Sequence, residues 1–425
     1  MKKVLVFFMV LFCTFVGSSW AGGINAEYEV SGDYRGRYQY QYDLDFNSDA
    51  KDNGGLIYSR VRVGLKTVLK NPDDEKLLTI FLQGLDARSG GHNLKAKKNQ
   101  RDSLDLSEGY LYLHEFLSPD MGLKVGRQTM KYGKCRLLAT PAWNNKVRCF
   151  DGGVFKYKTE DFLADLIYVR AVNFDDNNLN ESSADEELFG FYGTWKMSEG
   201  KTGLDGYFLT LEDQLTATEK TRHTVGMRLA GELCPDVCYD VELPVQFGEE
   251  GSKDIWAYAF HADISKQWPE QALKPRVSVA YNMASGDDSS GDDENNTFLP
   301  LYGTAHVPFG LIDLFRWQNM REIELKTELF LNKKLTLIPQ TNFFWLDNTN
   351  DYWYNSSGGK VRSSLPKGDV DSYVGQELSM VVKYKCNKSI KLEAGYAHFF
   401  SGGYIEDTGA SDDADFCYTQ FCYSF

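Results

Sequence analysis

A strict alternation of apolar and polar side chains is the feature that most constrains the fold of this chain. Between residues 28 and 42, Val30 and Tyr34 fall on one parity, and Glu29 and Arg35 fall on the other. Successive side chains of a strand point to opposite faces, so this pattern predicts a strand with one apolar and one polar face. The same split recurs in residues 60–66, 239–247 and 276–282.

Segments of this kind occur about eighteen times along the chain, and turn-rich links separate them. We therefore expect an all-β fold, a transmembrane antiparallel β-barrel of about 18 strands, because single-chain bacterial barrels have an even number. The expected strands lie near residues 27–42, 56–69, 76–88, 103–116, 121–130, 148–157, 162–172, 186–197, 204–212, 220–230, 237–248, 254–265, 274–284, 318–330, 334–346, 372–385, 389–400 and 414–425.

The links between these strands alternate in length. Short turns, as at residues 71–74, alternate with mostly longer links, of which the longest are 285–317 and 347–371. Short turns at one end and long loops at the other are typical of outer-membrane barrels. Two links on the long side, 213–219 and 249–253, are short, so sixteen strands are an alternative. A secreted β-sandwich or jelly roll also alternates, but it has no such rhythm of loop lengths.

Composition excludes two other classes of protein. The mean hydropathy is −0.41, and after the first twenty residues no apolar run reaches the roughly 18 residues that a spanning helix needs. A helical membrane protein is therefore excluded. The chain has 46 basic against 60 acidic residues, which argues against a nucleic-acid partner.

The N-terminus predicts export. Two lysines precede an apolar stretch over residues 4–16, and a small-residue boundary follows at Ala21. This arrangement is typical of a secretory signal peptide, and the stretch is shorter than the roughly 20 residues of a spanning helix. We expect a signal peptide at residues 1–21 and a single outer-membrane β-barrel at residues 22–425. The final Phe425 shares its parity with other aromatic residues, as in many outer-membrane barrels.

The sequence carries no recognisable catalytic or metal-binding motif. No nucleophile elbow, phosphate loop or dinucleotide fingerprint is present, and the histidines form no ligand pair. We therefore expect no enzyme activity, no cofactor and no metal. A barrel enzyme is an alternative, since His223 and His398 could face lipid near the outer rim. The six histidines are at positions 92, 114, 223, 261, 306 and 398.

Residues 286–294 are rich in carboxylates and could suit calcium, but they lack the EF-hand order of ligands. We interpret them as a solvated loop, and we expect the apolar continuation at residues 298–302 to fold into the barrel. Seven cysteines follow the signal peptide, so at least one is unpaired. Cys135 could pair with Cys149, and Cys234 with Cys238, or all of them could be isolated thiols.

The informative constellation is a set of arginines on the polar parity of several strands. In a barrel this parity faces the lumen, where a charge must be hydrated or paired. One interpretation is a ladder of ion pairs that stiffens the wall, and the other is a positive path that attracts anions, because guanidinium matches carboxylate bidentately. The set is Arg35, Arg37, Arg60, Arg62, Arg222, Arg228 and Arg276.

Several motifs along the mature chain are similar to those of the alginate-export family of outer-membrane proteins. They include Ser-Gly-Asp-Tyr-Arg-Gly-Arg-Tyr at 31–38, Val-Gly-Arg-Gln at 125–128 and Phe-Asp-Gly at 150–152. Each motif alone is weak, and their order and spacing carry the resemblance. Further matches lie at residues 59–65, 132–133, 136–137, 143–144, 224–229, 284–287, 297–302 with His306, and 399–404.

The resemblance implies an outer-membrane barrel whose arginine-lined pore passes a linear polyuronate. It adds Arg127, Arg136, Arg148 and Asp151 to the candidate pore lining, although the parity near Arg127 and Asp165 assigns no face to those strands. The chain departs from the family at Lys134-Cys135, where an acid is common. Its short turns also leave no room for a plug inserted from that end.

We therefore predict an outer-membrane channel that conducts an anionic oligosaccharide or polysaccharide, such as alginate or another polyuronate, through an arginine-lined pore. The partners are that solute and outer-membrane lipid. A general small-solute porin is the first alternative, and a barrel enzyme or receptor is a further one.

Overall fold

The computed structural model of the chain describes residues 23–50, 53–94, 100–176, 178–214, 218–289, 291–366 and 368–425. The expected signal peptide at residues 1–21 lies outside the described residues.

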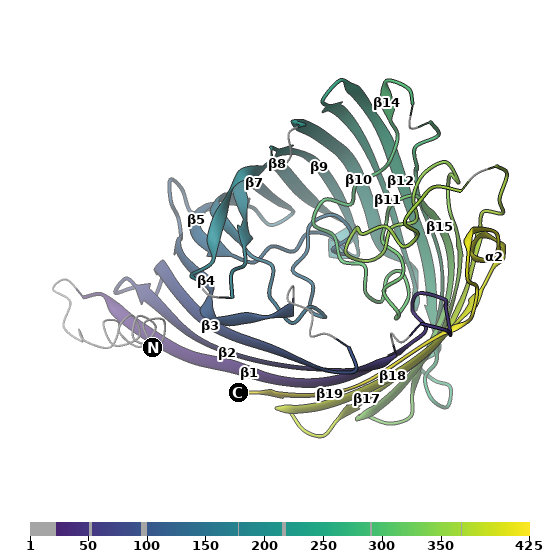
Figure 1. Cartoon of the computed structure of the whole chain (residues 1–425). Coiled ribbons are helices and arrows are strands. Elements are labelled where there is room, and N and C mark those ends of the chain that lie inside the picture. Colours follow the sequence, from purple (N-terminus) through teal and green to yellow (C-terminus); the bar gives the residue numbers. More distant parts are fainter. Residues whose placement is uncertain are drawn as a thin grey trace.

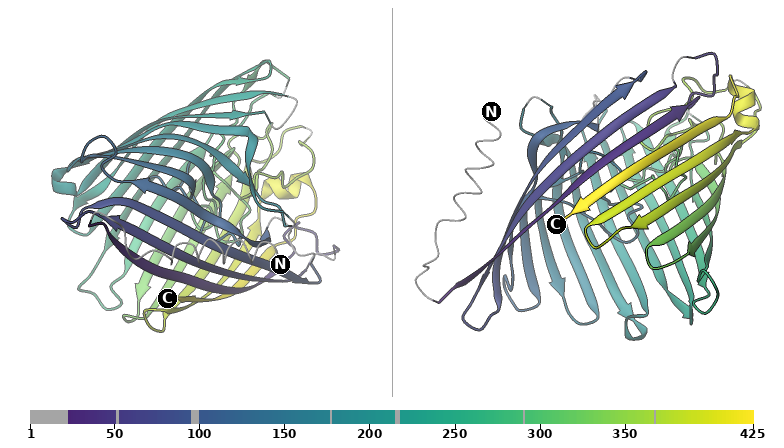
Figure 2. Two further views of the ribbon diagram at one scale, coloured as in Figure 1. Left: turned by 90° about the vertical axis from the view of Figure 1, so that its left-hand side faces the viewer. Right: turned by 90° about the horizontal axis from the view of Figure 1, so that it is seen from below.

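The described residues form one closed antiparallel β-barrel of eighteen long strands (Figures 1 and 2). Neighbours in the sequence are neighbours in the wall. The strands are β1 (Asn25–Tyr42), β2 (Gly54–Lys70), β3 (Lys76–His92), β4 (Asp102–Leu113), β5 (Met121–Gln128), β6 (Phe150–Lys158), β7 (Phe162–Asn173), β8 (Glu181–Met197), β9 (Thr202–Asp213), β10 (Lys220–Cys234), β11 (Val237–Glu250), β12 (Lys253–Gln267), β13 (Arg276–Ala284), β15 (Met320–Phe330), β16 (Leu335–Trp345), β17 (Tyr373–Lys385), β18 (Ile390–Ser401) and β19 (Ala414–Ser424).

Three further short elements lie outside this series in the described residues. β14 (Glu294–Asn295) pairs in parallel with β12, and it does not interrupt the wall because β13 pairs directly with β15. The 3₁₀ turn η2 (Ser198–Gly200) joins β8 to β9, and the helix α2 (Gly403–Thr408) precedes β19. None of the described helices has the length and apolarity to cross a membrane.

The barrel closes through β1, which pairs with β2 on one side and with β19 on the other. Gly32 and Phe425 exchange two backbone hydrogen bonds of 3.1 Å at this seam. All eighteen expected strands are present. The sixteen-strand alternative is wrong, because Lys220 pairs with Asp213, and Lys253 with Glu250, across the two short links. A closed wall also rules out a sandwich of two open sheets.

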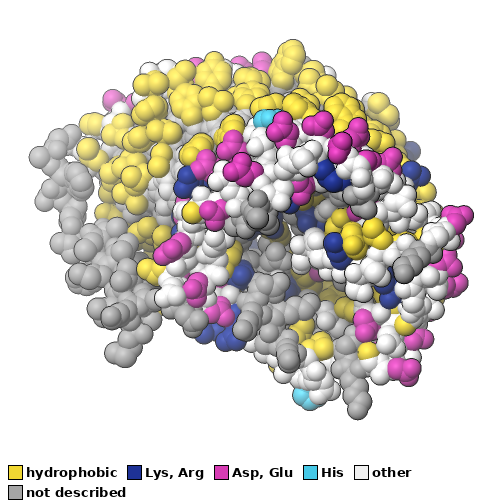
Figure 3. All heavy atoms as spheres, turned by 45° about the horizontal axis from the view of Figure 1, so that its top comes forward, with side chains coloured by type: hydrophobic (Ala, Val, Ile, Leu, Met, Phe, Trp, Pro, Cys, Tyr) yellow, Lys and Arg dark blue, Asp and Glu magenta, His cyan; other side chains and the backbone are white. Residues whose placement is uncertain are grey.

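The two faces of the wall differ as the alternation predicts. On β1, Tyr34 is 40% exposed, whereas the neighbouring Arg35 is 4% exposed. Figure 3 shows a broad hydrophobic surface over the outer wall, with charged side chains gathered around the opening of the barrel. An apolar outer face with many tyrosines suits the hydrocarbon and interfaces of an outer membrane.

Two long links fold into the barrel, and the ribbon shows irregular segments within the ring of strands (Figure 1). We call residues 129–149, between β5 and β6, the first inward segment. Residues 291–319, between β13 and β15, form the second inward segment, and the inward fold expected of residues 298–302 is present. Phe315 of the second segment stacks on Phe344 of the wall, with ring centroids 4.0 Å apart, inside one apolar cluster.

A methyl group at Gly32 is expected to weaken closure of the barrel. A Cβ there would lie 2.7 Å from the carbonyl oxygen of Arg62 and 2.5 Å from the ring of Phe425, so the seam must shift. Overpacking of this kind costs about 1–3 kcal/mol. Gly32→Ala should therefore lower the temperature at which detergent-purified protein loses the gel mobility of its folded form.

Gly206→Ala is the matched control, because a Cβ at Gly206 meets no atom within 4 Å. Equal transition temperatures for the two variants would contradict the importance of the seam.

Candidate channel constriction

Three arginines of β1 and β2 hold the first inward segment against the inner wall. Arg35 and Arg37 donate hydrogen bonds of 2.6–2.9 Å to the backbone carbonyl oxygens of residues 142–144. Arg60 donates to the carbonyl oxygen of Asn144 at 3.2 Å. Charged donors make stronger hydrogen bonds than neutral ones, so these contacts fix the position of the segment.

The next residue, Asn145, ties the same end of the segment to the wall. Its buried side-chain amide donates to the carbonyl oxygens of Ser59 and Arg88 at 3.2 and 2.9 Å. Its backbone N–H donates to the side chain of Gln100 at 2.7 Å. Burial of an amide is favourable only when its donors are satisfied, and here they are.

The other end of the segment reaches β11, about halfway around the barrel from β1. Arg136 lies 2.7 Å from Oε2 of Glu242 and 3.4 Å from Oδ1 of Asp240. Arg228 of β10 joins Asp240 to Asp205 of β9 with contacts of 2.6 and 2.9 Å. The first inward segment therefore crosses the interior and is anchored on opposite walls.

The two inward segments hold each other. Tyr302 of the second segment donates its N–H to the carbonyl oxygen of Leu137, and its own carbonyl oxygen accepts from Ala139. His306 stacks on Trp143 with ring centroids 3.7 Å apart, and the Arg37 guanidinium lies 3.6 Å from the centre of that ring. Trp143 is therefore packed between the wall and the second segment, and the pair of segments narrows the barrel.

Some of the expected arginines are neutralised by acids of the wall. Arg62 contacts Asp33 at 2.6 Å, and Arg276 contacts Glu328 at 3.2 Å near the end of the barrel. Arg228 is also paired, as described above. For Arg62, Arg228 and Arg276 the geometry matches the first interpretation of the sequence, a ladder of ion pairs along the wall.

Other expected arginines have no such partner. Among the described residues, no carboxylate lies within 4.0 Å of Arg35, Arg37 or Arg222; Arg222 donates instead to Gln246 at 2.8 Å and to the carbonyl oxygen of Thr297 at 3.2 Å. Arg148 donates to the carbonyl oxygen of Tyr302 in the second inward segment. Neither the ladder of ion pairs nor the positive path therefore describes all the expected arginines. Some of them are paired with carboxylates, and others have no carboxylate nearby and retain their charge.

Two expected pore residues lie on the other face of the wall. Arg127 and Asp151 form a two-bond ion pair at 2.8 Å, and Arg127 shares its parity with Val125, which is 47% exposed. The buried Phe150 and Val154 occupy the inward parity. We therefore remove Arg127 and Asp151 from the candidate pore lining. Their position near the strand ends places a charged pair beyond the apolar part of the outer face.

One arginine of this region was missed from the sequence. Arg316 belongs to the second inward segment, and no carboxylate lies within 4.0 Å of it in the described part of the chain. Burial and the nearby Arg148 cation lower the pKa of Arg316 to about 10, so it is protonated at neutral pH. An irregular link has no parity, which is why the alternation gave no signal for this residue.

A cavity of about 370 Å³ lies between the first inward segment and the wall. Its charged and polar lining combines two cations, a carboxylate and amide and aromatic groups. Oε1 of Gln420 is buried without a hydrogen-bond partner among the described residues. The cavity is therefore suited to a polar solute. The charged, amide and aromatic residues that line the cavity are Arg35, Lys131, Trp143, His306, Glu393 and Gln420.

The structure answers three questions that the sequence left open: which way Asp165 faces, whether the cysteines pair, and what surrounds His223 and His398. Asp165 lies inside the barrel, since it accepts from Lys156 and from Tyr132 of the first inward segment. All seven cysteines in the described part of the chain are free thiols, which matches the second of the two interpretations of the sequence. His223 contacts Thr210, and His398 contacts Asp413 and Asp415, and neither imidazole has a hydrogen bond to a described serine.

A closed eighteen-stranded wall with an apolar outer face and inward segments defines an outer-membrane β-barrel channel. Residues 27–418 match the family described as alginate export, and the chain belongs to this family. No curated protein matches the sequence.

Solved structures share the fold at low sequence identity. OpdO of Pseudomonas aeruginosa is 14% identical, with a TM-score of 0.63 over 94% of this chain and 97% of that one. OccK2 (OpdF) of the same organism, in complex with glucuronate, is 11% identical, with a TM-score of 0.61 over 94% and 98%. OccAB1 of Acinetobacter baumannii is 11% identical, with a TM-score of 0.62 over 96% and 98%.

Loss of the β11 anchor should release the first inward segment. Arg136→Gln leaves Asp240 and Glu242 with one cation fewer, and breaking a buried ion pair costs about 3–5 kcal/mol. We expect a larger and noisier single-channel conductance in planar bilayers than for the parent protein.

Arg321→Gln is the control for this experiment, because Arg321 pairs with Asp347 on the outward parity and is half exposed. A folded Arg136→Gln variant with the parent's conductance would contradict the anchoring role.

Proposed function

We propose that this channel conducts an anionic oligosaccharide or polysaccharide, with uronate-containing chains as the first candidates. The observation that carries the proposal is a group of arginines inside the barrel with no carboxylate within 4.0 Å among the described residues. A polyuronate supplies one carboxylate per sugar, so several weak contacts can act in series without trapping the chain. The group consists of Arg35, Arg37, Arg148, Arg222 and Arg316.

The formal net charge of the chain, −14, repels an anionic solute, whereas the arginines inside the barrel attract it. The distance of each charge from the solute decides which effect is larger. Charges in water are screened over about 8 Å at physiological ionic strength. Acids on the exposed links therefore act weakly at the constriction. The arginines that hold the inward segments lie inside the barrel beside those segments, so a solute that passes the segments comes close to them.

The cavity beside the first inward segment supports a binding subsite on this path. Arg35 and Lys131 supply positive charge there, and the unpartnered Gln420 oxygen can accept from a sugar hydroxyl. The structure of OccK2 in complex with glucuronate is a fold relative that holds a sugar acid, which agrees with the proposed class of solute.

A general porin is the second candidate, and acids on the inner wall favour it. Asp205, Asp240 and Glu242 are buried inside the barrel, so the interior is not uniformly positive. A wall with both signs of charge passes small solutes of either sign with modest preference. Neither candidate includes a catalytic step.

Block of ion current separates the two candidates and is the principal test. Short uronate oligomers should reduce the current through single channels in planar bilayers at concentrations where neutral oligosaccharides of equal length have no effect, because only the former have carboxylates for the arginines. Equal block by both kinds of oligomer would establish a general porin in place of the proposed channel.

Charge selectivity tests the role of the unpaired arginines. The parent channel should prefer anions, and Arg316→Gln should reduce that preference, because it removes a cation that no nearby acid neutralises. Arg321→Gln changes the net charge equally on the outward face and should leave the preference unchanged. A cation-selective parent channel, read from the reversal potential in a salt gradient, would refute the positive path.

A further inference from the structure

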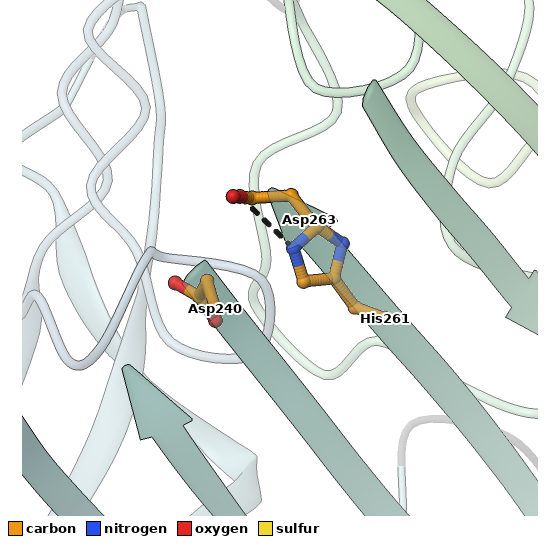
Figure 4. Close-up of side chains that lie close together, drawn as sticks. All are labelled: Asp240, His261 and Asp263. Atoms are coloured by element: carbon orange, nitrogen blue, oxygen red, sulfur yellow. Dashed lines mark ion pairs between the residues drawn. The ribbon is translucent and has the colours of Figure 1, made fainter. Parts of the chain in front are cut away.

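We propose that Asp240, His261 and Asp263 form a binding site for one divalent d-block cation, such as Zn²⁺, on the inner wall of the barrel. Asp240 lies on β11 and the other two residues lie on β12, where Asp240 pairs directly with Asp263 in the register. One ligand atom from each residue lies within 4.8 Å of the others. Figure 4 shows the imidazole and the two carboxylates turned toward a common space.

The hydrogen bonds of His261 fix which ring nitrogen is available. The side-chain nitrogen of Asn282 donates to Glu322 at 2.8 Å, so the amide oxygen faces His261. That oxygen lies 2.6 Å from Nδ1, which must therefore carry the proton and donate it. In a neutral imidazole the other nitrogen, Nε2, then presents a lone pair.

This lone pair has no hydrogen-bond donor as a partner in the described part of the chain. His261 is 5% exposed, and Nε2 makes no hydrogen bond to any described residue. Its nearest charged neighbour is Oδ2 of Asp263 at 3.4 Å, which is an acceptor as well. Two acceptors that face each other repel, and because the His261 ring is buried, water has little access to its nitrogen; a cation between the two acceptors removes the repulsion.

The charges around the site are net negative, so they can balance a dication. Arg136 and Arg228 are the two cations of the network, and the carboxylates are Asp205, Asp240, Glu242 and Asp263. The nearby Glu324 is paired with Lys326. Among the described residues, these carboxylates therefore exceed the two cations by two negative charges. Arg136 keeps its closer contact with Glu242, and Arg228 keeps Asp205, when Asp240 turns an oxygen to a metal.

The ligand set selects the class of cation. Imidazole nitrogen with carboxylate oxygens suits zinc and related d-block ions, whereas calcium and magnesium prefer oxygen ligands alone. The chain from Nδ1 through Asn282 to Glu322 orients the imidazole, as partners of metal-bound histidines do. Three protein ligands leave further positions for water. The site does not depend on which solute the channel conducts.

Calorimetric titration of the full-length barrel in detergent with ZnCl₂ tests the proposal. We expect one saturable site, and we expect His261→Gln and Asp263→Asn each to weaken it at least about tenfold, since even partners of metal ligands contribute about 10- to 100-fold. Co²⁺ should give visible absorption bands in the parent protein that both variants lose. Gel mobility of the folded form, read for every variant, shows that the barrel is intact.

His398→Gln is the matched control, because His398 also lies beside two carboxylates, Asp413 and Asp415, but on the outer face. It should leave the zinc affinity unchanged. Zinc binding that is lost with His398 and retained without His261 would overturn the assignment. So would an absence of zinc binding, in which case a proton on Nε2 neutralises the contact with Asp263.

Discussion

The closed ladder of backbone hydrogen bonds is the constraint on which the rest of this structure depends. In the hydrocarbon of a membrane an unpaired peptide group costs several kcal/mol, so a spanning sheet must have no free edge. Pairing of β1 with both β2 and β19 meets that condition, and the exchange between Gly32 and Phe425 extends it to the last residue. Closure also divides every strand into an outward and an inward face.

The inward face then has to accommodate charge, and the barrel does so in two ways. Around β9–β12 the guanidiniums of Arg136 and Arg228 are bound by carboxylates. On β1 the arginines donate instead, through their terminal guanidinium nitrogens, to backbone carbonyls of the first inward segment, which holds the segment without cancelling the charge. The same contacts thus position the constriction and leave it positive. This combination links the anchoring of the segment to the proposed passage of anions.

Strand positions and the facing of β1, β2, β10 and β11 could be predicted from the sequence, because period-two alternation is a local property. Arg35 and Arg62 were assigned inward on that basis, and the structure places them there. The strands near Arg127 gave no clear parity, because apolar and polar residues do not alternate strictly at strand ends. The resemblance of short motifs placed Arg127 and Asp151 in the pore, and the register of β5 and β6 turns them outward.

The sequence by itself determined the class of fold, the membrane and the places of the strands, since each follows from patterns within a few neighbouring residues, whereas strand pairing across the short links decided between eighteen and sixteen strands. Only the tertiary structure decided what the polar side chains do. Arg136 meets β11 across the barrel, Arg316 approaches Arg148, and His261 meets Asp240 through strand register. These groups are far apart in the chain, and their chemistry arises because barrel closure and the inward segments bring them to contact distance.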